Sequence, residues 1–285
     1  MLKRVLYAVA ILPVLGAISL SPANAGTLDR LRSDKTIRLA VRDDAPPFSF
    51  TNATGESAGY MVDLCRKVVA NIADQLKMAE LKIAYVSVKA DTRFDTMASG
   101  KADLLCEPTS VTLSRRERVD FSLPTFIDGA SLMVKGAGPN SFAALSGKKV
   151  GVLEGTTTEQ GLRVALKDAS INAEVTPFKT HTDGVKALQS GAIAAYFGDR
   201  SILLYLAMNA PDAKELNIAN EYFSFERYAL AMQRNDDDFR LAVDRALSGI
   251  YRRGEFAALF AGTFGAQAQP TELLKTLYLF SALPE

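Results

Sequence analysis

Residues 92–106, TRFDTMASGKADLLC, and residues 183–199, DGVKALQSGAIAAYFGD, follow one plan. In each stretch a short helix-like segment ends at Ser-Gly, and an apolar run follows directly. Glycine stops a helix because it adopts the left-handed conformation that a helix terminus favours, and a short apolar run is typical of a buried strand. The repetition predicts two similar lobes.

Strands and helices alternate around both stretches. The sequence predicts strands at 36–41, 82–88, 102–106, 149–153, 173–177 and 194–197, and helices at 61–75, 92–99, from 157, at 181–189, 200–209, 239–252 and 255–264. Strands joined by helices form parallel sheets. We therefore expect an α/β fold with two lobes, each a mostly parallel sheet flanked by helices.

Two further apolar runs, residues 129–135 and 228–233, have the character of strands that cross between the lobes. The last two helices would then return to the first lobe. The expected division assigns 26–130 and 236–285 to lobe 1 and 131–235 to lobe 2. Ligands of such sheets bind at the carboxyl ends of the strands, so the loops after the strands are the places to search.

The amino terminus has the pattern of a secretory signal peptide. Lys3 and Arg4 precede an apolar run over 5–20, and Ala23-Asn24-Ala25 matches the small-residue cleavage signal. A membrane anchor needs about 20 apolar residues, and Pro13 interrupts this shorter run. We expect residues 1–25 to be cleaved after Ala25 and the mature chain to reside in the periplasm.

Composition and charge restrict the function. A hydrophobic content of 48% and a charged content of 23% are typical of a globular chain. The net charge of +1 and the lack of a long Lys/Arg run argue against nucleic acid. An oxidising compartment favours a disulfide between Cys65 and Cys106, with two buried free thiols as the alternative. Two cysteines are too few for a metal cluster, and we expect neither metal nor cofactor.

The loop after the strand at 102–106 carries hydroxyl groups and an arginine. Ser110 and Thr112 precede Arg115, whose planar guanidinium can hold a carboxylate through two parallel hydrogen bonds. Thr112 can alternatively cap a helix. This loop is a candidate site for a carboxylate.

Two other loops carry candidate ligand-binding groups. Thr156 and Glu159 form a capping box, which leaves the first amides of the following helix free to bind an anion. Asp199 follows a strand and precedes a helix, so it is either an N-cap or a ligand-binding carboxylate.

The order and spacing of several segments resemble the periplasmic solute-binding proteins for polar amino acids. The segments run through the whole mature chain: PFSF at 47–50, GYMVDLC at 59–65, ASGKADLLC at 98–106, VTLSRRERVDFS at 111–122, GKKVGVLEGTTTE at 147–159 and LQSGAIAAYFGD at 188–199. Among these proteins the chain is most similar to the glutamate/aspartate-binding branch, through its two cysteines, RLAVRDDAPPFSF around Arg42, and the tail QPTELLKTLYLF.

This resemblance implies the two-lobed type II periplasmic binding fold with two crossover hinge strands and a receptor that delivers an amino acid to an inner-membrane ABC permease. It implies that Arg115 clamps the ligand α-carboxylate with help from Thr157 and Thr112. Asp199 would meet the α-ammonium. The family expectation is a monomer without enzymatic activity.

Three other residues concern the ligand side chain. The resemblance places Arg42 against a distal carboxylate and His181 in the pocket. Thr180 and Asp183 form a capping box that puts His181 in a first helical turn, where the helix dipole disfavours a protonated ring. A plain surface charge at Arg42 and a neutral structural histidine at 181 are the alternatives. Phe50 is a candidate aromatic contact.

Glu107 and Pro108 depart from the branch, which has Gly-Ser at these positions. If Glu107 faces the cleft it would repel a dicarboxylate and select a neutral or basic amino acid instead. An exported enzyme similar to cyclohexadienyl dehydratases, with Glu107 or Glu154 as general acid, is a further alternative.

Overall fold

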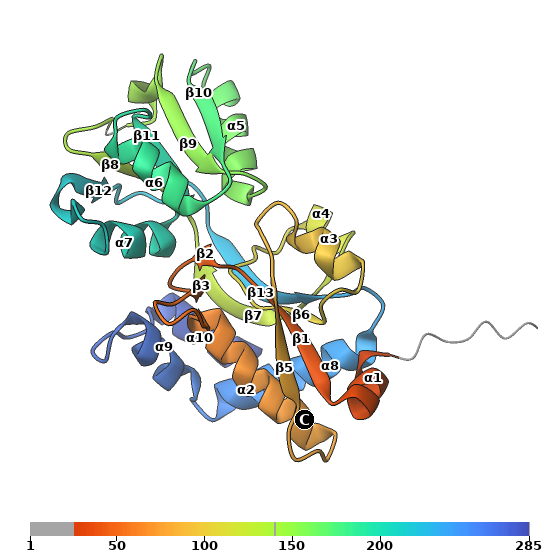
Figure 1. Cartoon of the computed structure of the whole chain (residues 1–285). Coiled ribbons are helices and arrows are strands. Elements are labelled where there is room, and N and C mark those ends of the chain that lie inside the picture. The colour runs from red at the N-terminus through yellow and green to blue at the C-terminus, as the bar shows by residue number, and fades with distance from the viewer. Residues whose placement is uncertain (1–25, 140, 285) are drawn as a thin grey trace, which may run out of the picture.

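Two lobes make up the protein (Figure 1). The computed structural model describes residues 26–139 and 141–284, so the expected signal peptide lies outside the described residues. None of the helices in that part of the chain is long and apolar enough to cross a membrane.

The first lobe contains a five-stranded sheet in the order β5-β1-β6-β13-β7. Its strands are β1 (Thr36–Val41), β5 (Lys82–Ser87), β6 (Leu104–Leu105), β7 (Asp120–Asp128) and β13 (Glu226–Met232). β1 pairs in parallel with β5 and β6, whereas β13 runs antiparallel to β6 and β7. β6 is shorter than the expected 102–106, and at its start the Asp103 carboxylate, rather than a strand carbonyl, accepts the hydrogen bond of the Arg38 amide.

The second lobe repeats this arrangement in the order β10-β9-β11-β8-β12. Its strands are β8 (Ala130–Lys135), β9 (Lys149–Leu153), β10 (Glu174–Phe178), β11 (Ala195–Asp199) and β12 (Leu216–Ile218). β9 is parallel to β10 and β11, and β8 is antiparallel to β11 and β12. The shared order of three parallel strands and one antiparallel neighbour agrees with the repeated sequence plan.

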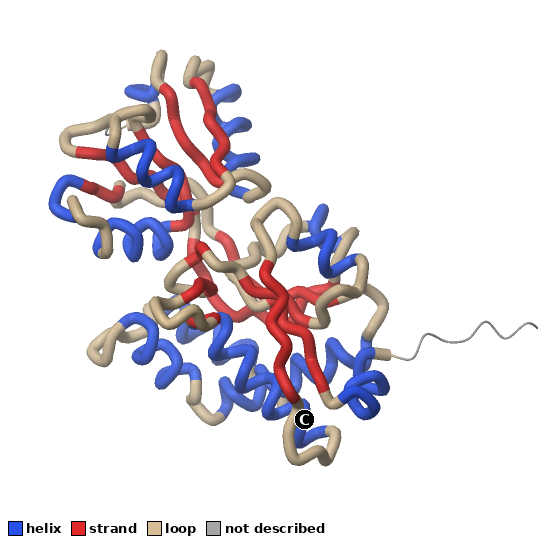
Figure 2. Tube along the Cα trace, viewed as in Figure 1, coloured by secondary structure: helices blue, strands red, loops and turns tan. Residues whose placement is uncertain are grey.

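Helices lie on both sides of the strands in each lobe (Figure 2). The first lobe carries α1 (Thr27–Asp34), α2 (Tyr60–Gln75), α3 (Arg93–Ala98), α4 (Leu113–Arg116), α8 (Asp237–Arg252), α9 (Phe256–Phe264) and α10 (Glu272–Ser281), and the second carries α5 (Thr157–Asp168), α6 (His181–Gln189) and α7 (Arg200–Met208). α6 has the expected bounds because the Thr180 hydroxyl caps it, accepting from the Asp183 amide at 3.1 Å. The sequence patterns did not predict α1 and α10.

A small antiparallel sheet lies beside the cleft. It consists of β2 (Asp44–Ala45), β3 (Ser49–Thr51) and β4 (Ser57–Ala58). Its position matters because β2 contacts α6 of the other lobe.

The two crossing segments lie against each other at Gly129. A Cβ at this position would lie 1.9 Å from the Ser224 carbonyl oxygen, so only glycine allows the close approach. β13 begins at Glu226 and hydrogen-bonds within the first sheet, whereas the expected second lobe extended to residue 235. The return crossing therefore precedes Glu226, because the run YALAM pairs with β7 rather than with the strands of the second lobe.

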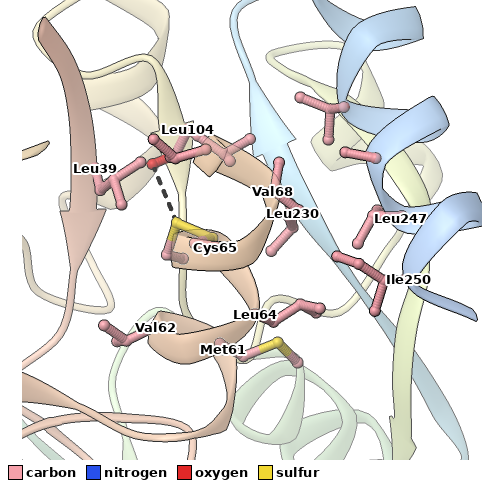
Figure 3. Packing of buried hydrophobic residues seen from close by; sticks show 14 of the residues in the cluster. Leu39, Met61, Val62, Leu64, Cys65, Val68, Leu104, Leu230, Leu247 and Ile250 are labelled. Atoms are coloured by element: carbon pink, nitrogen blue, oxygen red, sulfur yellow. Dashed lines mark hydrogen bonds between the residues drawn. A yellow bond between two sulfur atoms is a disulfide. The ribbon is translucent and has the colours of Figure 1, made fainter. Parts of the chain in front are cut away.

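The core of the first lobe surrounds α2. Its apolar positions face the sheet, and Cys65 packs with Leu39, Leu104 and Val68 (Figure 3). Cys65 and Cys106 form a disulfide, which confirms the expected pairing. The bridge ties α2 to the end of β6, directly before Glu107.

Candidate ligand-binding site

A small cavity of about 20 Å³ lies between the two lobes, at the carboxyl ends of strands from both sheets. Its walls comprise Arg42, Arg93, Pro108, Ser110, Arg115, Leu153, Thr156, Thr157, Thr158, His181, Phe197, Gly198, Asp199 and Ile202. Seven of the nine binding residues expected from the sequence are among these, and Phe50 and Thr112 are not. The cavity is lined mainly by polar groups.

Arg115 lies in α4, which is a single helical turn, and is 9% exposed. One Nη1 donates to the Ser110 carbonyl at 2.8 Å, and the guanidinium carbon lies 5.1 Å from the centre of the Phe94 ring. These contacts hold the guanidinium in one orientation against the cavity wall. Burial lowers the pKa of Arg115, but its ordinary value is so high that the group stays charged.

Asp199 ends β11 on the opposite lobe. It occupies the N-cap position of α7, yet its side chain makes no capping hydrogen bond. The carboxylate instead accepts from the Tyr228 hydroxyl at 2.6 Å and the Thr158 hydroxyl at 3.1 Å. Burial and the nearby Glu226 carboxylate raise the pKa of Asp199 to about 6. A positively charged ligand group would relieve this accumulation of buried negative charge.

The expected capping box is present at the start of α5. The Thr156 hydroxyl accepts from the Glu159 amide at 3.1 Å, and the Glu159 carboxylate accepts from the Gly155 amide at 3.0 Å. Thr157 reaches the first lobe, where its hydroxyl donates to Glu226 at 2.6 Å and lies 3.4 Å from the Ser110 hydroxyl. The helix terminus and its hydroxyls therefore face the same cavity as Arg115.

Arg42 and His181 approach the cavity from different lobes. The Arg42 guanidinium donates from Nε and Nη2 to one Asp44 carboxylate oxygen at 2.9 and 2.6 Å. His181 is fully enclosed, and its Nδ1 lies 3.0 Å from the Tyr196 hydroxyl. Burial and the Arg42 charge lower the pKa of His181 to about 3, so the ring is neutral at physiological pH. His181 thus supplies a neutral polar contact, not a second cation.

Arg93 supplies that second cation, and the sequence patterns did not assign it to the site. It begins α3, is 2% exposed and lines the cavity. Its Nη1 lies 3.5 Å from the Gly155 carbonyl of the other lobe. Burial lowers the pKa of Arg93 to about 10, so the guanidinium remains charged. The sequence does hold one indication that Arg93 is buried. Arg93 and Met97 are four positions apart, so they share a helix face, and Met97 is an apolar residue of the core.

Glu107 does not line the cavity. Its side chain is 0% exposed and lies behind the two arginines, with Oε1 3.2 Å from Arg93 Nε and Oε2 3.8 Å from Arg42 Nη1. Glu107 was expected to repel a dicarboxylate if it faced the cleft. It does not face the cleft, so this direct repulsion does not arise. Its neighbour Pro108 does line the cavity.

Thr112 and Phe50 have other roles in this structure. The Thr112 hydroxyl caps α4 by accepting from the Arg115 amide at 3.1 Å, which is the alternative foreseen for it. The Phe50 ring packs against Tyr205 of the other lobe, with 5.9 Å between ring centres.

The lobes touch each other around the cavity. Lys179 of the second lobe pairs with Asp91 of the first at 2.8 Å, and the His181 amide donates to Asp44 at 3.2 Å. These contacts, together with those of Thr157 and Tyr228, connect the lobes on several sides of the cavity. The structure therefore has the closed arrangement in which both lobes can contact one ligand.

The profile of the bacterial extracellular solute-binding proteins, family 3, matches residues 37–266. The chain belongs to this family. The L-glutamate/L-aspartate-binding protein of Pseudomonas aeruginosa is 30% identical over 250 residues, covering 87% of this chain and 83% of that protein. The glutamate/aspartate import solute-binding protein of Salmonella typhimurium is 26% identical over 254 residues, covering 89% and 84%.

Solved structures of amino-acid-binding proteins share the fold. An ancestral arginine-binding protein bound to arginine superposes with a TM-score of 0.73 and 28% identity, covering 81% of this chain and 99% of that one. The fold is that of the type II periplasmic binding proteins, as the resemblance implied. These family 3 proteins are named for binding amino acids, and the chain is an amino-acid solute-binding protein of the ABC-importer type.

Proposed function

We propose that this protein binds an acidic amino acid, glutamate or aspartate, between its lobes and delivers it from the periplasm to an inner-membrane ABC permease. The observation that carries the proposal is the distribution of charge on the cavity wall. Three arginines and one aspartate line it, with Arg115 and Asp199 on opposite lobes. An acidic amino acid carries two carboxylates and one ammonium, which complements this wall.

Arg115 and Asp199 would hold the two charged groups of the ligand backbone. Arg115 retains N–H groups beyond the Nη1 that binds Ser110, and a guanidinium binds a carboxylate through parallel hydrogen bonds. Asp199 is buried with hydroxyl donors and forms no ion pair with any residue that the structure describes, so the α-ammonium would supply a cationic partner. Each lobe contributes one of these charges, so a ligand favours the closed state by binding it better than the open one.

Arg42 and Arg93 would meet the distal carboxylate. Both guanidiniums reach the cavity, whereas the acids Asp44 and Glu107 that pair with them are absent from its lining. A ligand in the cavity therefore meets the positive side of each ion pair. The names of the relatives from Pseudomonas and Salmonella agree with this preference.

Calorimetric titration of the mature chain tests the proposal. We expect L-glutamate or L-aspartate to bind, and L-leucine and L-arginine to bind at least 100-fold more weakly, because they leave Arg42 and Arg93 without a ligand acceptor. Absence of binding by both acidic amino acids would refute the proposal.

A further inference from the structure

Glu107 is a buried carboxylate whose role the proposed binding mode does not explain. Its two oxygens lie near Arg93 and Arg42, yet neither accepts a hydrogen bond from any residue that the structure describes. A buried carboxylate without hydrogen bonds is rare, because desolvation strongly disfavours the charge. Its position is fixed by the disulfide at Cys106, which ties the preceding residue to α2.

With Glu107 ionised, the charges of the side-chain subsite balance before any ligand enters. Arg42 and Arg93 contribute two positive charges to the cavity wall. Asp44 and Glu107 lie behind them, at 2.6 Å from Arg42 and 3.2 Å from Arg93 respectively. His181 is neutral and adds no charge to this balance.

A subsite whose charges balance distinguishes acidic from neutral ligand side chains less strongly than one that holds an unpaired arginine. An unpaired buried guanidinium requires a carboxylate, so a neutral side chain would be rejected strongly. Here each guanidinium keeps an anionic partner when the ligand side chain is neutral. The remaining N–H groups that face the cavity can donate to an amide oxygen as well as to a carboxylate.

We propose that Glu107 is the specificity-determining residue of this site and that its buried counter-charge makes the subsite accept the amides glutamine and asparagine as well as the acids. The inference rests on the proposed function and adds the amides to the ligand class. Glu107 acts through Arg42 and Arg93 and is therefore a positioning residue that does not contact the ligand.

An acidic ligand adds one negative charge, and Glu107 can accommodate it by taking up a proton. Burial raises the pKa of Glu107, while Arg93, Arg42 and Arg115 oppose the rise and Asp44 adds to it. A ligand carboxylate beside the same arginines weakens their support for the ionised form. Binding of glutamate is thus expected to take up more protons than binding of glutamine.

The test is titration calorimetry of the mature chain with glutamate, glutamine, aspartate and asparagine. We expect the wild-type affinities for each acid and its amide to agree within about tenfold. In Glu107→Gln the arginines lose a counter-charge, so the preference for the acid is expected to rise at least tenfold. The control is Glu117→Gln, an equal charge change at a nearby exposed residue. It should leave the ratio of the affinities for acid and amide unchanged.

The outcomes separate this inference from the proposed function. A wild-type preference for acids above 100-fold, or an unchanged ratio in a folded Glu107→Gln, overturns the role of Glu107 and leaves the receptor function standing. Failure of all four ligands to bind overturns the proposed function itself. If Glu107→Gln does not fold, two measurements on the wild type still test the inference. They are the ratio of its affinities for each acid and the matching amide, and the proton uptake on binding measured in two buffers of different ionisation enthalpy. Equal uptake for glutamate and glutamine would contradict the accommodation by Glu107.

Discussion

Replacing Arg115 by alanine is expected to abolish the binding of every amino acid, whatever its side chain. Arg115 is held by the Ser110 carbonyl at 2.8 Å and by the Phe94 ring, so its remaining N–H groups are presented to the cavity in a fixed orientation. A ligand α-carboxylate is common to all amino acids. The loss should therefore not depend on whether the side chain is acidic or neutral.

The size of the effect follows from the hydrogen bonds removed. A hydrogen bond to a charged group contributes about 1.5–3 kcal/mol, and two parallel bonds to one carboxylate contribute about 3–6 kcal/mol. Since about 1.4 kcal/mol corresponds to a tenfold change in affinity, Arg115→Ala is expected to weaken binding by about 100-fold or more. Arg115→Lys keeps the charge but not the planar geometry, and should fall between the wild type and Arg115→Ala.

Titration calorimetry with several amino acids measures this loss, and circular dichroism verifies folding, because the variant also leaves the Ser110 carbonyl without its donor. Arg116→Ala changes the exposed neighbour in the same helix and serves as the control. Retention of affinity within tenfold in folded Arg115→Ala would refute the assignment of the carboxylate clamp.

Three further predictions concern pH, the disulfide and lobe closure. The pKa of Asp199 is about 6, and a ligand ammonium requires the ionised form, so the affinity for L-glutamine, whose neutral side chain does not call for proton uptake at Glu107, should be constant above pH 7 and fall by up to about tenfold per pH unit below pH 6. A flat calorimetric profile from pH 5 to 8 would contradict this. The Cys65–Cys106 bridge spans a sequence separation of 41, and the double serine variant should lose about 3–4 kcal/mol of unfolding free energy in urea titrations; a loss below about 1 kcal/mol would contradict the entropic account. Lys179 is 58% exposed and pairs with Asp91 across the cleft at 2.8 Å. Lys179→Ala should therefore weaken ligand binding less than about fivefold, and less still at high salt. A 100-fold loss of affinity would contradict this, because it would show that the surface pair controls closure.

Local sequence signals were sufficient where one short stretch determines the geometry. The helix at 181–189 was predicted with its final bounds because Thr180 is a strong N-cap followed by apolar residues at helical spacing. Arg115 was identified because it follows a buried strand in a loop of hydroxyl residues. Asp199 was expected to follow a strand ending at residue 197 and to precede a helix; in the structure β11 extends to Asp199 itself and α7 begins directly after it.

Sequence patterns could not determine how deeply a charged residue is buried. Glu107 and Pro108 both follow β6, yet Pro108 lines the cavity and Glu107 lies behind it, which depends on how α3 and β1 pack around the loop. Arg93 is buried because it faces Glu107, a partner 14 positions away in the sequence. Likewise, β13 joins the first sheet through its pairing with β7, a contact that no local pattern encodes.

The central claim is that the two lobes hold the two charged ends of one amino acid, with Arg115 on the carboxylate and Asp199 on the ammonium. The most direct test compares L-glutamate with glutarate, which lacks the α-ammonium, and with 4-aminobutyrate, which lacks the α-carboxylate, by titration calorimetry of residues 26–285. The account predicts that both analogues bind at least 100-fold more weakly than L-glutamate, because each leaves one buried charge without its partner. Binding of either analogue within tenfold of L-glutamate would contradict it.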